Sequence, residues 1–239
     1  MNNTNSLDKH LLNQIESSNN FFWLKARHRL IITLVKKLEI KNILDIGAGV
    51  GGLGIEAVKG GIDYYFSEPD KNSNIYLKNK FGIDKEIILN KNLNSKFENK
   101  SALVFLDVFE HVENPKKLFN EYSEILQYQD FLIFTVPAYQ CLWSNWDIYL
   151  GHFRRYNRKS CREFIKILNL EIIEVSYLFP ELLIPAIYRK VKNSNQINFP
   201  KLPKSINNFL FLISIFISKL RRIIPFGLSV LVVAKKIKN

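Results

Sequence analysis

One glycine-rich stretch constrains the fold of this chain more than any other feature. From Asn42 to Gly52 the sequence reads NILDIGAGVGG. The apolar residues from Ile43 to Ile46 are typical of a short buried strand, and the glycines indicate a sharp turn into a helix. The N-terminus of such a helix presents free N–H groups. The stretch therefore predicts a strand–turn–helix unit whose turn binds a polar or anionic ligand.

Asp45 narrows the choice of ligand. Gly47, Gly49 and Gly52 have the spacing of the dinucleotide fingerprint, which alone is a weak signal. A carboxylate in a buried strand is costly unless hydrogen-bond donors face it, and a nicotinamide-binding turn normally has an apolar residue there. The amino-acid end of S-adenosylmethionine would supply such donors. We therefore expect this cofactor, with a dinucleotide or a ligand-free structural turn as the alternatives.

Composition limits the class of protein. The chain has 239 residues, 47% of them hydrophobic, which is enough for one domain with a sizeable core. Lys and Arg (34) outnumber Asp and Glu (22), and the net charge of +12 favours an anionic partner, although the lysines are scattered. Cys141 and Cys161 form no metal or disulfide pattern, and neither a signal peptide nor a membrane-spanning run is seen. We expect a cytoplasmic protein.

Strands and helices alternate along the chain, which predicts a mostly parallel sheet between helical layers. The expected strands are 43–46, 63–67, 86–89, 102–106, 131–136, 171–177 and 228–234. The expected helices are 21–38, 53–59, 71–80, 115–128, 160–168 (with Ser160 as N-cap) and 209–220. We divide the chain into a flexible lead-in (1–20) and a single domain (21–239), which includes an aromatic and basic loop (138–156) and an insertion with an apolar helix (180–222).

Polar residues follow several of the expected strands, where a parallel sheet binds its ligands. Glu68 lies about twenty residues beyond the glycines, the position of an acid that binds ribose hydroxyls, and Pro69 would fix it. Asn90 follows the third strand and could bind an adenine amino group. His111, after the fourth strand, is either a catalytic base or a residue that fixes the local turn.

The loop 138–156 is long and rich in aromatic residues, which argues for function over disorder. In it, His152 is a second candidate base, with Asp147 placed to orient it. Arg154 and Arg155 could clamp a phosphate or carboxylate, although we expect one of them to pair with an acid of the protein itself.

The acceptor side is predicted to include Trp143, Trp146, Asp147, His152, Arg154, Arg155 and Tyr156 from this loop, with Trp23 and Arg27 from the first helix. The aromatic side chains would face a sugar or ring, or simply pack the loop. The first helix is either a lid whose Trp23 and Arg27 close over the cofactor, or a helix packed on the sheet with a solvated basic face.

These features resemble the class I S-adenosylmethionine-dependent methyltransferases over roughly residues 21–236. The segments that carry the resemblance are LDIGAGVG (44–51), the acid Glu68, and DVFEHV (107–112) with Pro115. Residues 22–27, 136–144 and 147–156 resemble a bacterial subgroup often found near polysaccharide glycosyltransferases.

The resemblance implies a Rossmann-like α/β sheet with strand order 3-2-1-4-5-7-6 and an antiparallel strand seven. It also implies that the glycine loop holds the methionine moiety, Glu68 the ribose, and the strand ends at 90–92 and 107–108 the adenine. The predicted cofactor-binding residues are Asp45, Gly47, Ala48, Gly49, Gly51, Glu68, Pro69, Asn90, Asn92, Asp107, Val108 and His111.

The function expected from the sequence is O-methylation, by in-line methyl transfer, of a small-molecule, glycan or lipid-linked saccharide acceptor. We expect this acceptor to be anionic or linked to a lipid. The alternatives are an RNA methyltransferase, which the absence of a basic stripe disfavours, and a non-catalytic cofactor-binding protein. Residues 206–222 could contact a membrane surface, another subunit or the protein's own core. We predict no metal site, because Glu110 and His111 alone are only two ligands.

Overall fold

The computed structural model describes Ile15 and residues 21–88, 99–192 and 202–238. The chain forms two compact units, and each is described by itself. The first unit comprises Met1–Val104 and Lys204–Ile215, and the second comprises Phe105–Pro203 and Phe216–Asn239. The lead-in 1–20 (apart from Ile15), Asn90, Asn92 and residues 193–201 of the predicted insertion lie outside the described residues.

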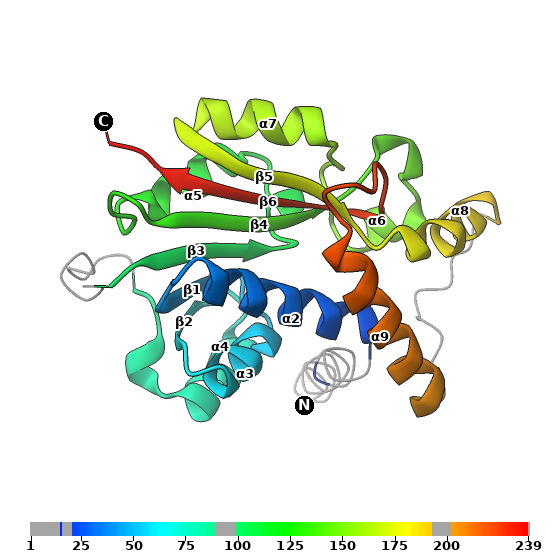
Figure 1. Ribbon diagram of the computed structural model, residues 1–239. Helices are drawn as coiled ribbons and strands as arrows, with labels where there is room; N and C mark the ends of the chain where they lie inside the picture. The colour runs from blue at the N-terminus through cyan, green and yellow to red at the C-terminus, as the bar shows by residue number, and fades with distance from the viewer. Residues whose placement is uncertain (1–14, 16–20, 89–98, 193–201, 239) are drawn as a thin grey trace, which may run out of the picture. The chain divides into compact units, whose positions relative to one another are not determined.

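The strands form a six-stranded sheet in the order β2-β1-β3-β4-β6-β5 (Figure 1). They are β1 (Asn42–Ile46), β2 (Asp63–Ser67), β3 (Ser101–Leu106), β4 (Phe131–Pro137), β5 (Leu170–Leu178) and β6 (Ser229–Lys236). This order is the predicted one without its third strand. The predicted α/β fold class of the methyltransferases is thereby confirmed.

The helices of the described residues alternate with these strands (Figure 1). The α-helices are α2 (Phe22–Lys37), α3 (Gly52–Lys59), α4 (Lys71–Phe81), α5 (Pro115–Ser123), α6 (Asn145–Tyr149), α7 (Arg158–Ile167), α8 (Leu183–Val191) and α9 (Lys204–Lys219). The short 3-10 helices are η1 (Ile83–Lys85), η2 (Phe109–His111), η3 (Gln140–Leu142) and η4 (Pro180–Leu182).

In the first unit, β1 is buried along its whole length and pairs in parallel with β2 and β3. The helix α3 packs closely on β2 because Gly54 has no side chain. A Cβ added at Gly54 would lie 2.4 Å from Cε1 of Tyr64. The glycine-rich stretch is therefore constrained by packing as well as by its turn.

The N-terminal helix α2 packs its apolar side inward and is held at its start by α9. The side chain of Asn207 in α9 accepts a hydrogen bond from the backbone N–H of Phe22 at 3.1 Å, which satisfies a free donor of the first turn. Arg27 and His28 are buried. The prediction that this helix has a solvated basic face is therefore only partly correct. Of its four basic residues in this turn, Lys25 and Arg29 are exposed and the other two are buried.

In the second unit, β6 runs antiparallel to both β4 and β5, which confirms the predicted antiparallel strand. The apolar residues of β4 are buried, and α7 packs on β5 and β6. Phe109 packs against Phe105 and Phe134, with ring centroids 4.5 and 5.2 Å away. This aromatic cluster anchors the segment after β3 in the core.

Two predicted elements differ from the structure. The strand expected at 86–89 is reduced to one isolated bridge between Glu86 and Phe66, and Leu89 lies outside the described residues. The helix expected at 115–128 ends at Ser123, and the ammonium of Lys236 donates there to the carbonyl oxygens of Ser123 and Leu126.

Two segments contain more structure than the sequence suggested, and two helices begin two or more residues earlier: α9 begins at Lys204 instead of residue 209, and α7 at Arg158 instead of residue 160. The loop 138–156 contains η3 and α6, and the insertion contains η4 and α8. The N-cap of α7 is Asn157 and not Ser160. The Asn157 side chain accepts from the Ser160 N–H at 2.9 Å, and the Ser160 hydroxyl accepts from the Asn157 N–H at 3.0 Å.

We predict that Asn157→Ala lowers the free energy of unfolding by about 1 kcal/mol, because it removes this cap from α7. Urea unfolding measures the change. Asn120→Ala is the matched control, since Asn120 lies within α5, where alanine favours the helix. An equal loss in both variants would contradict the assignment of the cap.

Candidate functional site

The glycine turn after β1 leaves open space beside its backbone. Gly47, Gly49 and Gly51 all have positive φ, between 57° and 71°, which glycine adopts without strain. A Cβ added at Gly49 would meet no atom within 4 Å, so a ligand can approach the backbone there. Gly51 instead faces the protein, since its Cβ would lie 2.6 Å from the Phe81 ring.

Glu68 faces this turn from the end of β2. Its carboxylate accepts hydrogen bonds from the N–H of Gly49 at 2.7 Å and from the N–H of Asp70 at 2.9 Å. Burial raises the pKa of Glu68, and the two backbone hydrogen bonds oppose this. A carboxylate has about four acceptor positions, so Glu68 can still bind the hydroxyls of a ribose. The residues present therefore fit the adenosyl cofactor.

Asp45 has a donor within the protein, which the sequence did not reveal. The hydroxyl of Tyr64 in β2 donates to the Asp45 carboxylate at 2.8 Å. The premise that a ligand must supply the donors is therefore too strong. Burial raises the pKa of Asp45 to about 7, while Tyr64 and the guanidinium of Arg27 oppose the shift.

The other predicted residues of the first unit have different environments. Arg27 is buried, and its positive charge acts on the carboxylate of Asp45. Arg27 therefore lies near the strand that leads into the glycine turn. Trp23 is partly exposed and stacks on Phe21, with ring centroids 4.5 Å apart. Pro69 is exposed after Glu68. The roles of Trp23, Arg27 and Pro69 toward a ligand stay predictions.

In the second unit, Asp107 follows β3 with a positive φ of 56°, which is uncommon for a residue with a side chain. The Thr135 hydroxyl donates to its carboxylate at 2.9 Å, and the Asp107 N–H donates to the Thr135 carbonyl at 3.0 Å. Backbone strain of this kind is frequent at functional sites. Val108 comes next and leads into η2, which carries Glu110 and His111.

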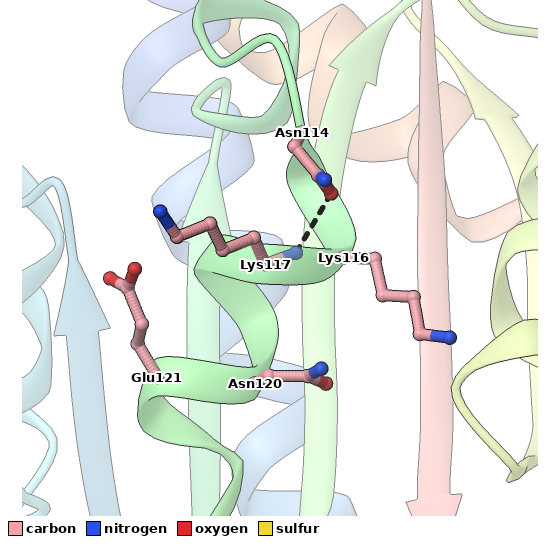
Figure 2. A pocket seen from close by; sticks show the side chains of 5 residues that line it. All are labelled: Asn114, Lys116, Lys117, Asn120 and Glu121. Carbon is pink, nitrogen blue, oxygen red and sulfur yellow. Dashed lines mark hydrogen bonds between the residues drawn. The ribbon is translucent and has the colours of Figure 1, made fainter.

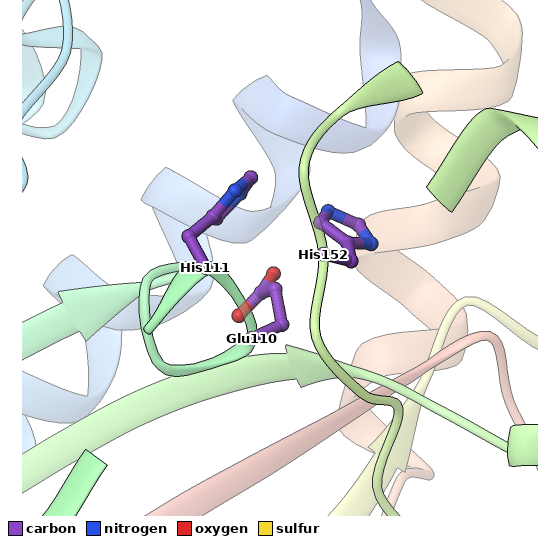
Figure 3. A group of neighbouring side chains, drawn as sticks. All are labelled: Glu110, His111 and His152. Carbon is purple, nitrogen blue, oxygen red and sulfur yellow. The ribbon is translucent and has the colours of Figure 1, made fainter. Parts of the chain in front are cut away.

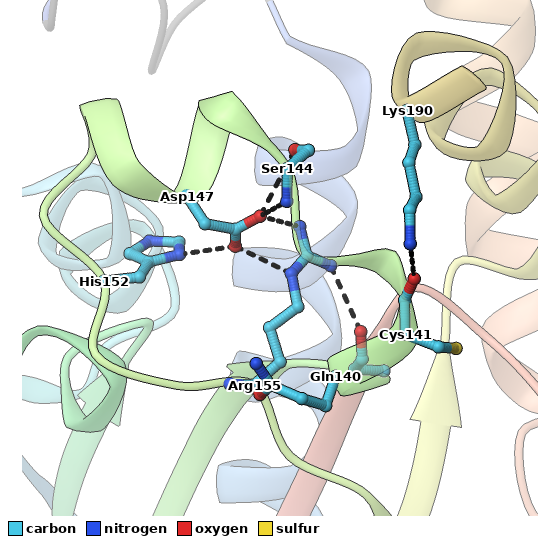
Figure 4. A network of polar contacts seen from close by, with 8 residues as sticks. Gln140, Cys141, Ser144, Asp147, His152, Arg155 and Lys190 are labelled. Carbon is cyan, nitrogen blue, oxygen red and sulfur yellow. Dashed lines mark hydrogen bonds and ion pairs between the residues drawn. The ribbon is translucent and has the colours of Figure 1, made fainter. Parts of the chain in front are cut away.

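The carboxylate of Asp147 organises the loop 138–156 (Figure 4). It is fully buried and pairs with the Arg155 guanidinium at 2.7 and 3.0 Å. It also accepts from the Ser144 N–H and contacts Nδ1 of His152, both at 2.9 Å. These hydrogen bonds lower the pKa of Asp147 to about 2 despite its burial. The expectation that Asp147 orients His152 is confirmed.

Both arginines of the predicted clamp bind groups of the protein itself. Arg155 is held by Asp147, as expected for one of the pair, and it also donates to the Ala138 carbonyl. Arg154 donates to the carbonyl oxygens of Val112 and Glu113, the latter at 2.6 Å. These guanidiniums hold the loop in place, and a role of Arg154 or Arg155 toward a phosphate or carboxylate stays a prediction.

The aromatic residues of the loop have different environments, and their roles toward a ligand stay predictions. Tyr156 is buried and its hydroxyl donates to the Phe109 carbonyl at 3.2 Å. Trp146 lies under the Arg189 guanidinium of α8, 4.4 Å from ring centroid to Cζ. Trp143 is partly exposed. The ammonium of Lys190 in α8 also binds the Cys141 carbonyl (Figure 4).

His111 and His152 come together with Glu110 (Figure 3). One possible ligand atom from each side chain lies within 4.8 Å of the others. The ring centroids of the two histidines are 4.6 Å apart. The sequence showed Glu110 and His111 as a pair but missed the third member, because His152 lies about forty residues further on and no local pattern connects them.

A surface hollow over α5 is lined by none of the predicted site residues (Figure 2). It is lined by Asn114, Lys116, Lys117, Asn120 and Glu121. Here Asn114 caps α5 by accepting from the Lys117 N–H at 3.0 Å. The lining side chains are those of an ordinary solvated helix surface, and we assign them no role.

Comparison with known proteins gives the family. The sequence model of the family described as "Methyltransferase domain" matches residues 21–175, more than half of the chain. The chain belongs to this methyltransferase family. The methyltransferase is S-adenosylmethionine-dependent, as its resemblance to class I implied, so the predicted enzyme class and cofactor are confirmed. No curated protein matches it in sequence.

Solved structures share the fold of the methyltransferase at low identity. A SAM-dependent methyltransferase of Archaeoglobus fulgidus is 15% identical, with a TM-score of 0.50, and 87% of this chain and 94% of that chain are covered. A protein described as a sarcosine dimethylglycine methyltransferase of Galdieria sulphuraria is 16% identical, with a TM-score of 0.53 and coverages of 89% and 85%. Phosphoethanolamine N-methyltransferase 2 of Haemonchus contortus is 19% identical, with a TM-score of 0.54 and coverages of 87% and 52%.

We predict that the ionisation of Asp45 lowers the stability of the cofactor-free methyltransferase as the pH rises. The carboxyl ionises near pH 3.8 when unfolded but only near pH 7 when folded, so the folded state loses stability between these values and regains none above them. The full loss is on the order of 4 kcal/mol. Asp45→Asn should remove it.

Urea unfolding at several values between pH 4 and pH 8 measures this difference. Asp63→Asn is the control, because Asp63 is exposed at the edge of the first unit. If the profiles of Asp45→Asn and the wild type run parallel, Asp45 is not held in the environment described here.

Proposed function

We propose that this methyltransferase O-methylates a hydroxyl of a small molecule, a glycan or a lipid-linked saccharide. S-adenosylmethionine supplies a methyl group that its sulfonium already activates. The first unit binds it, with Glu68 accepting from the ribose hydroxyls and the open side of Gly49 receiving the methionine moiety. The role of the second unit is to bind and prepare the acceptor.

The observation that carries the choice of a hydroxyl is the pair of imidazoles, His111 and His152, beside the Glu110 carboxylate. A hydroxyl has to lose its proton in order to accept a methyl group, and imidazole is the usual group that assists near neutral pH. Asp147 fixes the orientation of His152 at 2.9 Å. The fold itself does not select the acceptor, since one structural neighbour is a phosphoethanolamine N-methyltransferase.

The net charge of +12 supports an anionic acceptor. Because Arg154 and Arg155 bind groups of the protein itself, the charge recognition is assigned to other basic residues. The resemblance of residues 22–27, 136–144 and 147–156 to proteins of polysaccharide loci supports a saccharide. Nucleic acid is the less favoured partner, since its binding usually requires a basic stripe or an added binding module.

The helix α9 supports a lipid-linked acceptor, because it exposes an apolar stripe. Along one side of the helix and the turn after it lie Ile206, Phe209, Leu212, Phe216, Leu220 and Ile223, each between 40% and 80% exposed. Exposed lysines, Lys204 and Lys219, stand at the two ends of the helix. Among the described residues, no helix is both long and apolar enough to cross a bilayer.

An apolar stripe with basic ends suits a helix that lies in a membrane interface, with its lysines near anionic head groups. We therefore propose that α9 holds the methyltransferase at the surface of a membrane that contains anionic lipid. A membrane surface is one of the three contacts expected from the sequence for residues 206–222, and a cytoplasmic protein would make it at the inner face of the membrane.

Calorimetric titration tests the cofactor side of the proposal. We expect S-adenosylmethionine and S-adenosylhomocysteine to bind and NADH not to bind. Glu68→Gln should weaken binding at least about tenfold, because it removes a charged acceptor from the ribose hydroxyls. Glu56→Gln is the matched control, since Glu56 on α3 forms surface ion pairs with Arg29 and Lys59.

Release of S-adenosylhomocysteine with a panel of acceptors tests the acceptor side. The panel contains free and lipid-linked saccharides, amines and RNA. Turnover with a hydroxyl-bearing saccharide supports the proposal, while turnover only with amines or RNA would reject it. Binding of NADH alone would indicate that the glycine turn is a dinucleotide site and would reject the cofactor assignment.

Sedimentation with lipid vesicles tests the role of α9. The triple variant Phe209→Ser, Leu212→Ser, Phe216→Ser should bind vesicles of anionic lipid at least about tenfold more weakly than the wild type, because it removes the apolar stripe. Vesicles of neutral lipid should bind the wild type less well than anionic ones.

The control for this variant replaces exposed apolar residues elsewhere: Val58→Ser, Ile75→Ser, Ile83→Ser. It should bind vesicles as the wild type does. A different outcome is a wild type that binds no vesicles and forms a dimer that the α9 variant does not form. In that case the stripe binds a second copy of the chain, and the membrane proposal is wrong.

A further inference from the structure

The side chains of Glu110, His111 and His152 converge in the second unit from two separate segments (Figure 3). Glu110 and His111 belong to η2, directly after β3, and His152 belongs to the loop that follows α6. Glu110 is buried, whereas His111 is exposed. The group therefore has a buried side within the protein and an open side toward solvent.

Backbone hydrogen bonds hold the two segments together beside these residues. The N–H of Phe153 donates to the Glu110 carbonyl at 2.7 Å, immediately after His152. Arg154 binds the carbonyl oxygens of the two residues that follow His111. The backbone positions of Glu110, His111 and His152 are thus fixed relative to one another.

Each imidazole is also oriented by a second contact. His152 uses Nδ1 to contact the Asp147 carboxylate at 2.9 Å, and Arg155 holds that carboxylate in turn. The ring of His111 forms a hydrogen bond with the backbone of Leu150. One nitrogen of each ring is therefore engaged and the other is available. Histidines that bind metals normally have this arrangement, with a carboxylate or a carbonyl on the second nitrogen.

We propose that Glu110, His111 and His152 bind a divalent first-row transition cation, such as Zn²⁺ or Mn²⁺. Two imidazoles and one carboxylate suit these cations better than Mg²⁺ or Ca²⁺, which prefer oxygen ligands. Three protein ligands leave coordination positions open, and open positions are typical of catalytic rather than structural sites. The exposed side of His111 gives a further ligand access to them.

The geometry requires only a small adjustment. Ligand atoms about 2.1 Å from a cation are at most about 4.2 Å from one another, and here they lie within 4.8 Å. His111 is exposed, so its ring can rotate inward while Glu110 and His152 stay in place.

The catalytic role of the cation rests on the proposed function, whereas its binding does not. A cation at this site would hold the acceptor hydroxyl and lower its pKa, so that solvent could take the proton. The two imidazoles would then coordinate the cation instead of acting as the base. The acceptor class that fits is one with a hydroxyl beside a second oxygen donor, as saccharides have, because both oxygens can reach the open positions.

Titration of the full chain with metal tests the proposal without cofactor or acceptor. After treatment with a chelator, the wild type should bind one equivalent of Zn²⁺ or Mn²⁺ in calorimetry, and Mg²⁺ more weakly. His111→Ala should weaken binding at least about 100-fold and still fold, because His111 is exposed. Glu113→Gln, on the same segment but outside the group, should bind like the wild type.

Substitution of the orienting residue gives a second readout. Asp147→Asn should weaken binding by about 10- to 100-fold, as losses of such contacts do, and should change the visible absorption of bound Co²⁺. Circular dichroism shows whether each variant is folded. A wild type that binds no Zn²⁺ or Mn²⁺, or an affinity that His111→Ala leaves unchanged, would overturn the proposal.

The outcome is separable from that of the proposed function. Metal binding without turnover of any hydroxyl acceptor would support the site and reject O-methylation. Turnover of a saccharide that continues in excess chelator would support O-methylation and overturn the catalytic role of the cation, while the titration alone decides whether the cation binds.

Discussion

The second unit depends on the buried carboxylate of Asp147. A charge out of water is costly unless it is paired and hydrogen-bonded, and Asp147 meets both conditions. Arg155 forms two short contacts with it, while Ser144 and His152 occupy further acceptor positions. Because these partners precede and follow Asp147 in the loop 138–156, one side chain holds the segment 144–155 in a fixed shape. Removing either charge would leave the other buried without its charged partner.

Asp45 in the first unit shows how the same residue type behaves with weaker partners. It has a neutral hydroxyl, that of Tyr64, as its hydrogen-bond donor, and Arg27 acts on it through its charge. Burial therefore dominates and raises the pKa of Asp45 to about 7, whereas that of Asp147 is lowered to about 2. Asp147 is stabilised within the protein. Asp45 is held in an unfavourable environment, which a ligand with N–H donors would relieve.

Much of the first unit could be predicted because its signals are local. The glycine spacing and Pro69 lie within a few residues of the turns that they define, and the strand 63–67 was predicted with the bounds that β2 has. Glu68 also follows from a short count along the chain. The Tyr64 donor to Asp45 could not be read in this way, since it depends on the register of two strands and on which face each side chain takes.

Less of the second unit could be predicted, because its contacts join remote segments. The sequence indicated that Asp147 and His152 interact, because they are five residues apart, and that one of the two arginines pairs with an acid of the protein. It could not show which arginine this is, or that Arg154 binds backbone carbonyl oxygens of a remote segment. The approach of His152 to Glu110 depends on hydrogen bonds between segments about forty residues apart, such as that from the N–H of Phe153 to the Glu110 carbonyl. No local pattern records a contact of that kind.

The sequence alone therefore determined the α/β class, the glycine turn, the acid after β2 and the cofactor, because short-range backbone geometry requires those residues at those spacings. The tertiary structure alone decided which charged side chains bind groups within the protein and which buried acid is destabilised. It also decided that Glu110, His111 and His152 come together. Those outcomes depend on burial and on distances between remote segments, and both exist only once the chain has folded.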